Sequence, residues 1–231
     1  MVEKLRATMI VENRSRDPRL ASSWGLSMLI EVGDRRILFD VGPDFHVLLG
    51  NAQMLGVDLR SIDAVFISHW HGDHAAALPQ LLEYLGRDVP IYVPSPRGVG
   101  REIVARAGES VLIEDALSTG PMGFGIREHS LIVKVGDGIA VFVGCSHPGI
   151  DEILERATRV SGCDRVELVM GGLHIGGFEA SYVANTFRAY GVRIVVPAHC
   201  TSDEAIEIIK RELSGAAQVL DPFVGLRVEL G

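Results

Sequence analysis

Ser68-His69-Trp70-His71-Gly72-Asp73-His74 is the stretch of this sequence that decides the fold, because three imidazoles and a carboxylate fall within six consecutive positions. Neutral histidine is a common ligand of zinc and iron, and imidazoles two residues apart suit either metal. Asp73 and His74 offer a second pair of ligands directly after the first. The stretch therefore predicts a metal site.

The neighbouring segments place this stretch on a turn between a strand and a helix. Residues 62–67 are a short apolar run rich in β-branched and aromatic side chains, which is typical of a buried strand. Residues 75–85 have the pattern of a helix. The carboxyl end of a strand is where α/β proteins usually carry their chemistry. Surface histidines and a helix cap at Asp73 are the alternatives, but a His-x-His-x-Asp-His run favours metal binding.

The composition predicts a single domain over residues 1–231. The chain is 47% hydrophobic and 23% charged, so it can bury a large core and is not disordered. We find no internal repeat and no linker that would divide it. Residues 13–23 form the longest irregular stretch, which predicts a loop at the site.

Charge and cysteine content exclude several classes of protein. The net charge is −8 without a run of basic residues, so nucleic-acid binding through a broad basic surface is not expected. Three scattered cysteines, Cys145, Cys163 and Cys200, make no disulfide framework. No apolar stretch is long enough for a membrane span, and residues 1–6 are unlike a signal peptide. We therefore expect a cytoplasmic protein that binds neither nucleic acid nor membrane.

Hydrophobic periodicity and turn residues predict strands alternating with helices. Strands are expected at residues 5–12, 26–32, 36–40, 62–67, 90–94, 130–135, 139–143, 166–170, 193–196, 219 and 226–230. Helices are expected at residues 44–55, 75–85, 97–107, 150–160, 179–190 and 202–213. Hairpins followed by strand–helix alternation, with a repeat of that order, predict an α/β fold of two mixed sheets packed together with helices on the outer faces.

Three further histidines, His147, His174 and His199, stand just past the carboxyl ends of apolar strands, as His69 does. Such strand ends can converge on one pocket, so the shared placement favours a functional role over isolated structural histidines. We expect His147 and His199 to be metal ligands. For His174 a substrate contact or a proton shuttle is favoured over metal binding.

Other polar residues near these strand ends have ordinary alternatives. Asp40 ends another strand, where it can hydrogen-bond a ligating histidine or simply occupy a turn. Cys145 and Cys200 flank predicted ligands, and we expect both to be packing residues. His129 is a less favoured ligand, and His46 is expected on the surface of the first helix.

The run from His69 to His74, with Asp40-Val41-Gly42 upstream and His199 downstream, resembles the metallo-β-lactamase superfamily over nearly the whole chain. That resemblance implies an αββα sandwich with a one- or two-metal site at one edge of the sheets. Further stretches resemble the subgroup typified by 7,8-dihydropterin-6-methyl-4-(β-D-ribofuranosyl)aminobenzene-5′-phosphate synthase, which belongs to archaeal methanopterin biosynthesis. These stretches are Trp24–Ser27, Gly144–Ile150, Gly171–His174 and Pro197–Thr201.

Two positions depart from the family pattern. Most of the superfamily carries an aspartate that bridges two metals after the strand that ends here at Gly144, and this chain has Cys145-Ser146-His147 instead. Either one metal binds, or His147 takes the place of the bridge. Trp24 stands where the subgroup is expected to carry histidine or another polar residue, which bears on the substrate.

The resemblance implies a divalent metal, zinc in the first place, with iron, manganese or magnesium as alternatives. The two predicted sets of ligands are His69, His71 and His147 for one ion and Asp73, His74 and His199 for a second. A bound metal lowers the pKa of water from about 15.7 towards about 7. If one ion binds, Asp73 is the expected general base. His174 is expected to give the substrate a proton or a hydrogen bond.

The expected activity is that of a metal-dependent hydrolase or transferase acting on a phosphorylated small molecule. Asn13, Arg14 and Arg16 in the early loop are candidates for binding its anionic group, although loop arginines are usually solvated. The rival interpretations are a mono-iron or di-iron redox enzyme on the same fold and a non-catalytic metal-binding protein. Small members of such families often associate, so a homo-oligomer is compatible with the sequence.

Overall fold

The computed structural model describes residue 2 and residues 4–231; Met1 and Glu3, which belong to the segment compared with a signal peptide, lie outside the described residues. The chain forms two compact units, unit 2 (Val2–Ala105 with Phe223–Gly231) and unit 1 (Arg106–Pro222). Each unit has its own seven-stranded mixed sheet and its own helices. The predicted fold class, two mixed sheets with helices, is confirmed, and a single domain over 1–231 stays a prediction.

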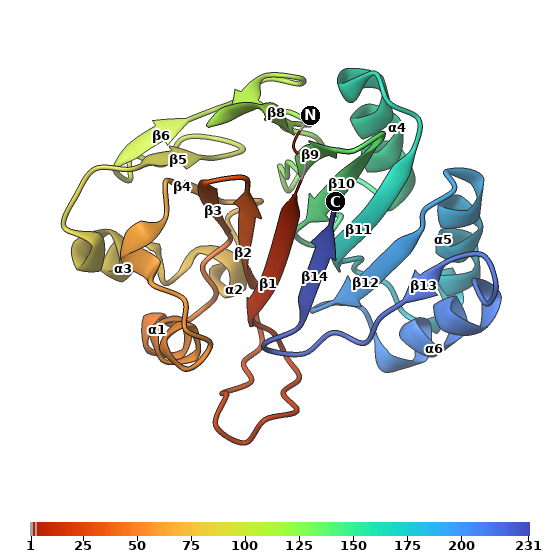
Figure 1. Cartoon of the computed structure of the whole chain (residues 1–231), viewed down its shortest axis with the longest axis horizontal. Coiled ribbons are helices and arrows are strands. Elements are labelled where there is room, and N and C mark those ends of the chain that lie inside the picture. Colours follow the sequence, from red (N-terminus) through yellow and green to blue (C-terminus); the bar gives the residue numbers. More distant parts are fainter. Residues whose placement is uncertain (1, 3) are drawn as a thin grey trace. The chain divides into compact units, whose positions relative to one another are not determined.

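Unit 2 is built on a sheet of order β14-β1-β2-β3-β4-β5-β6. Its strands are β1 (Leu5–Val11), β2 (Ser27–Val32), β3 (Arg35–Phe39), β4 (Ala64–Phe66), β5 (Pro90–Tyr92), β6 (Arg101–Ile103) and β14 (Arg227–Leu230). β14 pairs antiparallel with β1, so the dark blue and red strands lie side by side in Figure 1. Because β3, β4 and β5 are parallel, their carboxyl ends share one edge of the sheet.

The helices of unit 2 are α1 (Phe45–Met54), the single 3₁₀ turn η1 (Leu59–Ser61), α2 (Gly72–Ala75) and α3 (Leu78–Leu85). Asp44 caps α1 by accepting hydrogen bonds from two backbone N–H groups. Leu48 of α1 and Leu81 of α3 are fully buried in one cluster with Leu38 and Val65 of the sheet. Burying each leucine contributes roughly 1.5–3 kcal/mol, which holds the two helices on that face.

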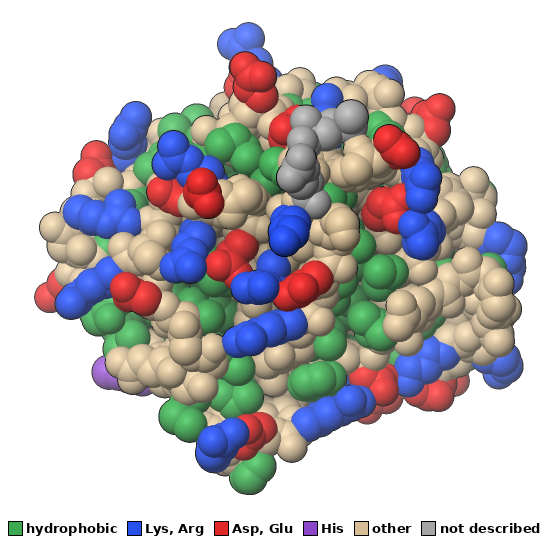
Figure 2. Space-filling view, in the orientation of Figure 1, with side chains coloured by type: hydrophobic (Ala, Val, Ile, Leu, Met, Phe, Trp, Pro, Cys, Tyr) green, Lys and Arg blue, Asp and Glu red, His purple; other side chains and the backbone are tan. Residues whose placement is uncertain are grey.

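Charged side chains of both signs cross the sheet of unit 2. Figure 2 shows them interspersed on the face that it presents. Arg6 lies 2.7 Å from Glu229, and Arg36 lies 3.3 Å from Glu31. Ion pairs as exposed as these contribute little to stability, so the core rather than the charges holds the sheet together.

Unit 1 is built on a sheet of order β13-β12-β11-β10-β9-β8-β7. Its strands are β7 (Ser110–Val111), β8 (Ile113–Ser118), β9 (Leu131–Val135), β10 (Gly138–Val143), β11 (Val166–Gly172), β12 (Ile194–Ala198) and β13 (Gln218–Val219). The strands from β10 to β13 are parallel, so their carboxyl ends also share one edge. All seven residues of β11 are buried, as expected of a central parallel strand.

Three helices flank the sheet of unit 1: α4 (Ile150–Ser161), α5 (Gly177–Ala189) and α6 (Asp203–Glu212). Each presents one apolar face, and Leu154, Phe187 and Ile209 meet Val169 of β11 in a single cluster. Ser202 caps α6, as its sequence predicts, by accepting from the backbone N–H of Ala205.

The helix predicted at residues 97–107 is wrong, because β6 and a turn occupy that segment. The Glu102 carboxylate accepts hydrogen bonds from the backbone N–H groups of Arg97, Gly98 and Val99, which closes a turn instead of a helix. Burial raises the pKa of Glu102, but these hydrogen bonds outweigh it and lower the pKa below its ordinary value.

Two smaller differences between prediction and structure concern the segments before and after residues 97–107. The helix expected at residues 75–85 is divided into α2, which begins at Gly72, and α3, in which Pro79 occupies the first turn. Strands β7 and β8 were not predicted; Leu112, between them, has φ +68° and makes an irregular turn.

Two findings bear on the class of protein. Within residue 2 and residues 4–231, no helix combines the length and the apolar character that crossing a membrane requires. Over the same residues, the three cysteines form no disulfide.

Candidate metal centre

Each unit gathers polar side chains where its parallel strands end. In unit 2, Asp40 follows β3 and the run from His69 to His74 follows β4. In unit 1, Cys145 and His147 follow β10, His174 comes two residues after the end of β11, and His199 directly follows β12. Parallel strands deliver these residues to one edge, which is the physical basis of the pattern seen in the sequence.

Asp40 is a buried carboxylate that orients two histidines of unit 2. Its Oδ1 accepts the backbone N–H of Ser68 at 2.7 Å, and its Oδ2 accepts the Ser68 hydroxyl at 2.7 Å. The same Oδ2 lies 2.7 Å from Nδ1 of His74. Because an ionised carboxylate only accepts, His74 donates from Nδ1, and we assign its lone pair to Nε2.

The Ser68 hydroxyl extends this control to His69. Its single proton goes to Asp40, so its oxygen accepts from Nδ1 of His69, which lies 3.0 Å away. His69 therefore also carries its lone pair on Nε2. One carboxylate thus fixes two imidazoles in the tautomer that binds a metal, a common arrangement around ligating histidines.

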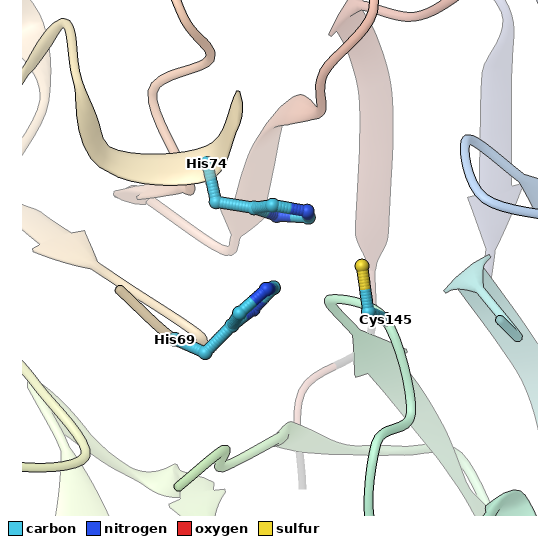
Figure 3. A group of neighbouring side chains, drawn as sticks. All are labelled: His69, His74 and Cys145. Carbon is cyan, nitrogen blue, oxygen red and sulfur yellow. The ribbon is translucent and has the colours of Figure 1, made fainter. Parts of the chain in front are cut away.

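The three rings of the histidine run lie close together. The ring centroids of His69 and His74 are 4.1 Å apart, and Figure 3 shows the two side chains side by side. Nε2 of His69 lies 3.1 Å from Nδ1 of His71. Two nitrogens bound at 2.0–2.1 Å to a tetrahedral zinc lie about 3.3 Å apart. His69 and His71 therefore fit two ligands of one ion without a large rearrangement.

Trp24 holds the carboxylate of Asp73. Its indole N–H donates to Asp73 Oδ2 at 3.0 Å, although the ring itself is 62% exposed. The backbone joins the same segments, because Leu26 donates its N–H to the carbonyl of Asp73. Asn13 accepts the N–H of Gly25 through its side chain at 3.1 Å. The early loop therefore lies against the histidine run, and the unusual Trp24 has a defined contact there.

Replacing Trp24 with phenylalanine removes this donor and keeps an aromatic ring. We expect the affinity for zinc to fall about 10-fold or more, because changes around metal ligands typically cost about 10–100-fold. Competition with a chromogenic chelator measures the loss. Trp24→His, which restores a ring N–H, is the control and should bind zinc within a few-fold of wild type. Equal zinc affinity in Trp24→Phe and wild type would show that the indole does not act on Asp73.

Unit 1 offers thiols as well as imidazoles. The ligand atoms of Cys145, His147 and His174 lie within 4.8 Å of one another, and so do those of Cys145, His199 and Cys200. Figure 3 shows the thiol of Cys145 on the turn after β10. Both thiolate sulfur and imidazole nitrogen are common ligands of zinc. The structure therefore adds Cys145 and Cys200, which the sequence indicated as packing residues, to the candidate ligands.

Backbone strain marks the same strand ends. Asp40, Ser146, His174 and His199 have φ of +53°, +58°, +51° and +50°. Such values are uncommon for residues other than glycine and gather at functional sites. Contacts between turns hold them: the Ser146 hydroxyl donates to the carbonyl of Gly172 at 2.8 Å, and the His174 N–H donates to Sγ of Cys200 at 3.2 Å.

The remaining predicted residues have identifiable surroundings. Arg14 pairs at 2.8 Å with the fully buried Glu12. His129 is buried 3.1 Å from the hydroxyl of Ser118 and joins no metal-ligand group among the described residues. His46 is exposed at the start of α1. The substrate role of Asn13 and Arg14, and the metal assignments that combine residues of both units, stay predictions.

Comparisons with known proteins agree with this architecture. Residues 35–134 match a family model described as a β-lactamase superfamily domain. The 7,8-dihydropterin-6-methyl-4-(β-D-ribofuranosyl)-aminobenzene-5′-phosphate synthase of Methanocaldococcus jannaschii is 24% identical, over 83% of this chain and 85% of its own.

Two solved structures extend the likeness to nearly the whole chain. A crystal structure described as a metal-dependent hydrolase of the β-lactamase superfamily is 26% identical, with a TM-score of 0.78 over 98% of this chain and 99% of its own. A metallo-β-lactamase fold protein from Bacillus subtilis is 16% identical, with a TM-score of 0.70 over 99% of this chain and 100% of its own. The second likeness concerns the fold alone.

Proposed function

The chain carries a β-lactamase superfamily domain and has the metallo-β-lactamase fold, and on this premise we propose that it is a divalent-metal-dependent enzyme acting on a phosphorylated small molecule. The observation that carries the proposal is the geometry around Asp40. This buried carboxylate aims Nε2 of both His69 and His74, and the facing nitrogens of His69 and His71 stand at the spacing of two zinc ligands. Histidines that served only for packing would not need this arrangement.

The ligands predicted from the sequence are our proposal for holding the metal: His69, His71, Asp73, His74, His147 and His199. The chemistry of the donor set fits zinc, and the thiol of Cys145 strengthens that fit. A divalent ion bound there would supply a hydroxide at neutral pH and charge to stabilise a developing oxyanion.

Two residues of the chain move protons in this proposal. If one ion binds, Asp73 takes a proton from the attacking water instead of serving as a ligand, and the Trp24 N–H fixes the direction of its carboxylate. His174 is exposed on its turn, where it can give a proton to the leaving oxygen of the substrate. The ring of His174 also lies against that of His147, with 4.9 Å between the centroids and 40° between the planes, which limits the positions that the His174 ring can take.

The M. jannaschii relative supports a phosphorylated substrate, because its name describes a synthase whose product is a 5′-phosphate. A transferase activity is therefore our second candidate. In that reaction the amino nitrogen of an aminobenzene ribosyl phosphate forms a bond to the methylene carbon of a pterin diphosphate, the diphosphate leaves, and the nitrogen loses one proton. The hydrolase and the transferase differ in the nucleophile, water or an aromatic amine, so product analysis separates them.

The test compares metal-free and reloaded protein on three probes. Protein treated with a chelator, then reloaded with zinc, manganese, iron(II) or magnesium, is assayed with bis(4-nitrophenyl) phosphate, with a lactone, and with a dihydropterin diphosphate plus the aminobenzene ribosyl phosphate. We expect turnover of a phosphorylated probe only in reloaded protein. Turnover that survives complete metal removal would refute the proposal, and so would a protein that binds none of the four ions. Dioxygen uptake by the iron(II) form would favour the redox alternative instead.

A further inference from the structure

Glu128 is a charged residue buried where no predicted role accounts for it. It pairs with Met122 in an isolated antiparallel β-bridge, shortly before β9 begins at Leu131, and it is 0% exposed. Sequence reasoning gave it no role. Burying a carboxylate is costly unless strong hydrogen bonds replace its water. Its partners therefore indicate what it does.

The carboxylate of Glu128 is hydrogen-bonded to the turn that follows β10. Oε1 accepts the backbone N–H groups of Gly144, Cys145 and Ser146 at 3.1, 2.9 and 2.9 Å. Oε2 accepts the backbone N–H of His147 at 3.0 Å and lies 2.8 Å from Nδ1 of its ring. One carboxylate thus accepts hydrogen bonds from four consecutive residues of this turn. His147, the last of them, is bound through both its main chain and its side chain.

The surroundings require the ionised form of Glu128. Four backbone N–H groups face its two oxygens. An N–H can only donate, so a proton on either carboxylate oxygen would compete with these donors. An ionised carboxylate beside Nδ1 in turn requires that Nδ1 carries the proton. The neutral imidazole of His147 then has its lone pair on Nε2.

We propose that Glu128 is the positioning residue of His147: it fixes this imidazole in the tautomer that offers Nε2 to a metal and sets the turn on which Cys145 and His147 stand. In unit 1 Glu128 therefore does for His147 what Asp40 does for His74 in unit 2. The part that concerns metal rests on the proposed function, whereas the part that concerns the tautomer does not.

A purely structural Glu128 would shape the turn without controlling the ring, and Glu128→Gln separates the two roles. The amide oxygen best replaces Oε1, because three N–H groups face that position. The amide NH₂ then faces Nδ1 of His147, which must accept instead of donate. The proton moves to Nε2, where it blocks metal binding.

The experiment reads the tautomer directly, by nitrogen NMR of metal-free protein labelled in histidine at about pH 8.5, above the ordinary histidine pKa of about 6.5. Wild type is expected to show His147 protonated on Nδ1 and not on Nε2. Glu128→Gln is expected to show the reverse. A proton on Nε2 in wild type, or an unchanged tautomer in folded Glu128→Gln, would overturn the inference.

Glu167→Gln is the matched control. Glu167 is another buried glutamate of unit 1, but it pairs with Arg193 at 2.8 Å, on β11 and away from the turn. Its replacement should leave the His147 tautomer unchanged. If Glu128→Gln does not fold, the same NMR measurement is made on zinc-loaded wild type. Zinc bound to Nε2 of His147, with Nδ1 still protonated, supports the inference. Zinc bound to Nδ1 overturns it.

Zinc affinity provides the second readout. We expect Glu128→Gln to bind zinc about 10–100-fold more weakly than Glu167→Gln. An inverted tautomer with unchanged zinc affinity would remove His147 from the ligands and overturn the metal part of the inference. A wild type that has the expected tautomer but binds none of the four ions would instead refute the proposed function. The failure of the inference and the failure of the proposed function can therefore be distinguished.

Discussion

Replacing His71 with alanine is expected to abolish metal-dependent turnover while the protein stays folded. His71 contributes one of two nitrogens that stand 3.1 Å apart, and no neighbouring side chain in the histidine run duplicates it. Because changes around metal ligands already cost about 10–100-fold in affinity or activity, loss of a ligand should cost more than about 100-fold. The side chain is exposed, so the free energy of unfolding should change by less than about 0.5 kcal/mol.

Metal content by mass spectrometry, zinc affinity and the hydrolysis rate of the phosphodiester probe measure this effect. His46→Ala is the control, because His46 is an equally exposed histidine of unit 2 that caps no helix and joins no metal-ligand group among the described residues. It should keep wild-type metal content and rate. A His71→Ala protein that retains both would remove the histidine run from the mechanism.

Replacing Gly171 with alanine is expected to destabilise unit 1 by about 3 kcal/mol or more. A Cβ at Gly171 would lie 1.9 Å from the carbonyl oxygen of Val143, in the paired strand β10, where no flexible side chain can move aside. Its φ of +136° adds strain for any other residue. Overpacking and strain each cost about 1–3 kcal/mol.

Thermal unfolding should show the effect as a midpoint lowered by about 6–12 °C in a chain of this length. Gly162→Ala separates strain from collision. Gly162 also has a positive φ, +67°, at the end of α4, but an added Cβ would meet nothing within 4 Å. Its cost should stay near about 1–2 kcal/mol. Equal unfolding midpoints for the two variants would contradict this expectation, because they would show that β10 and β11 can move apart at Gly171 without a cost in stability.

Much of the fold could be predicted because local signals and tertiary structure agree. The apolar run before His69 forms β4, the strands expected at residues 26–32 and 36–40 pair as β2 and β3, and the helix expected at residues 202–213 forms α6. The helix expected at residues 97–107 does not form, because hydrogen bonds to a side chain override the local sequence pattern there. The carboxylate of Glu102 closes a turn, and no periodicity reveals that bond.

The residues of the candidate site also fall into those that the sequence reveals and those that it does not. Histidines that follow strands could be found, since strand ends and imidazoles are both visible in the sequence. Glu128 could not be found, because four of its hydrogen bonds come from backbone N–H groups 16 to 19 residues further on, which carry no side-chain signature. Trp24 was noticed only as a departure from the family pattern, and its bond to Asp73 crosses 49 residues.

The left-handed turns at Asp40, Ser146, His174 and His199 have an evolutionary consequence. Each left-handed residue that is not glycine costs on the order of 1–3 kcal/mol, which the native state would recover if glycine stood there. At His174, whose side chain is exposed, directed evolution for heat resistance alone would therefore drift towards glycine, and activity would be lost as stability increased. A screen for tougher variants of this protein should be run with selection for turnover in every round.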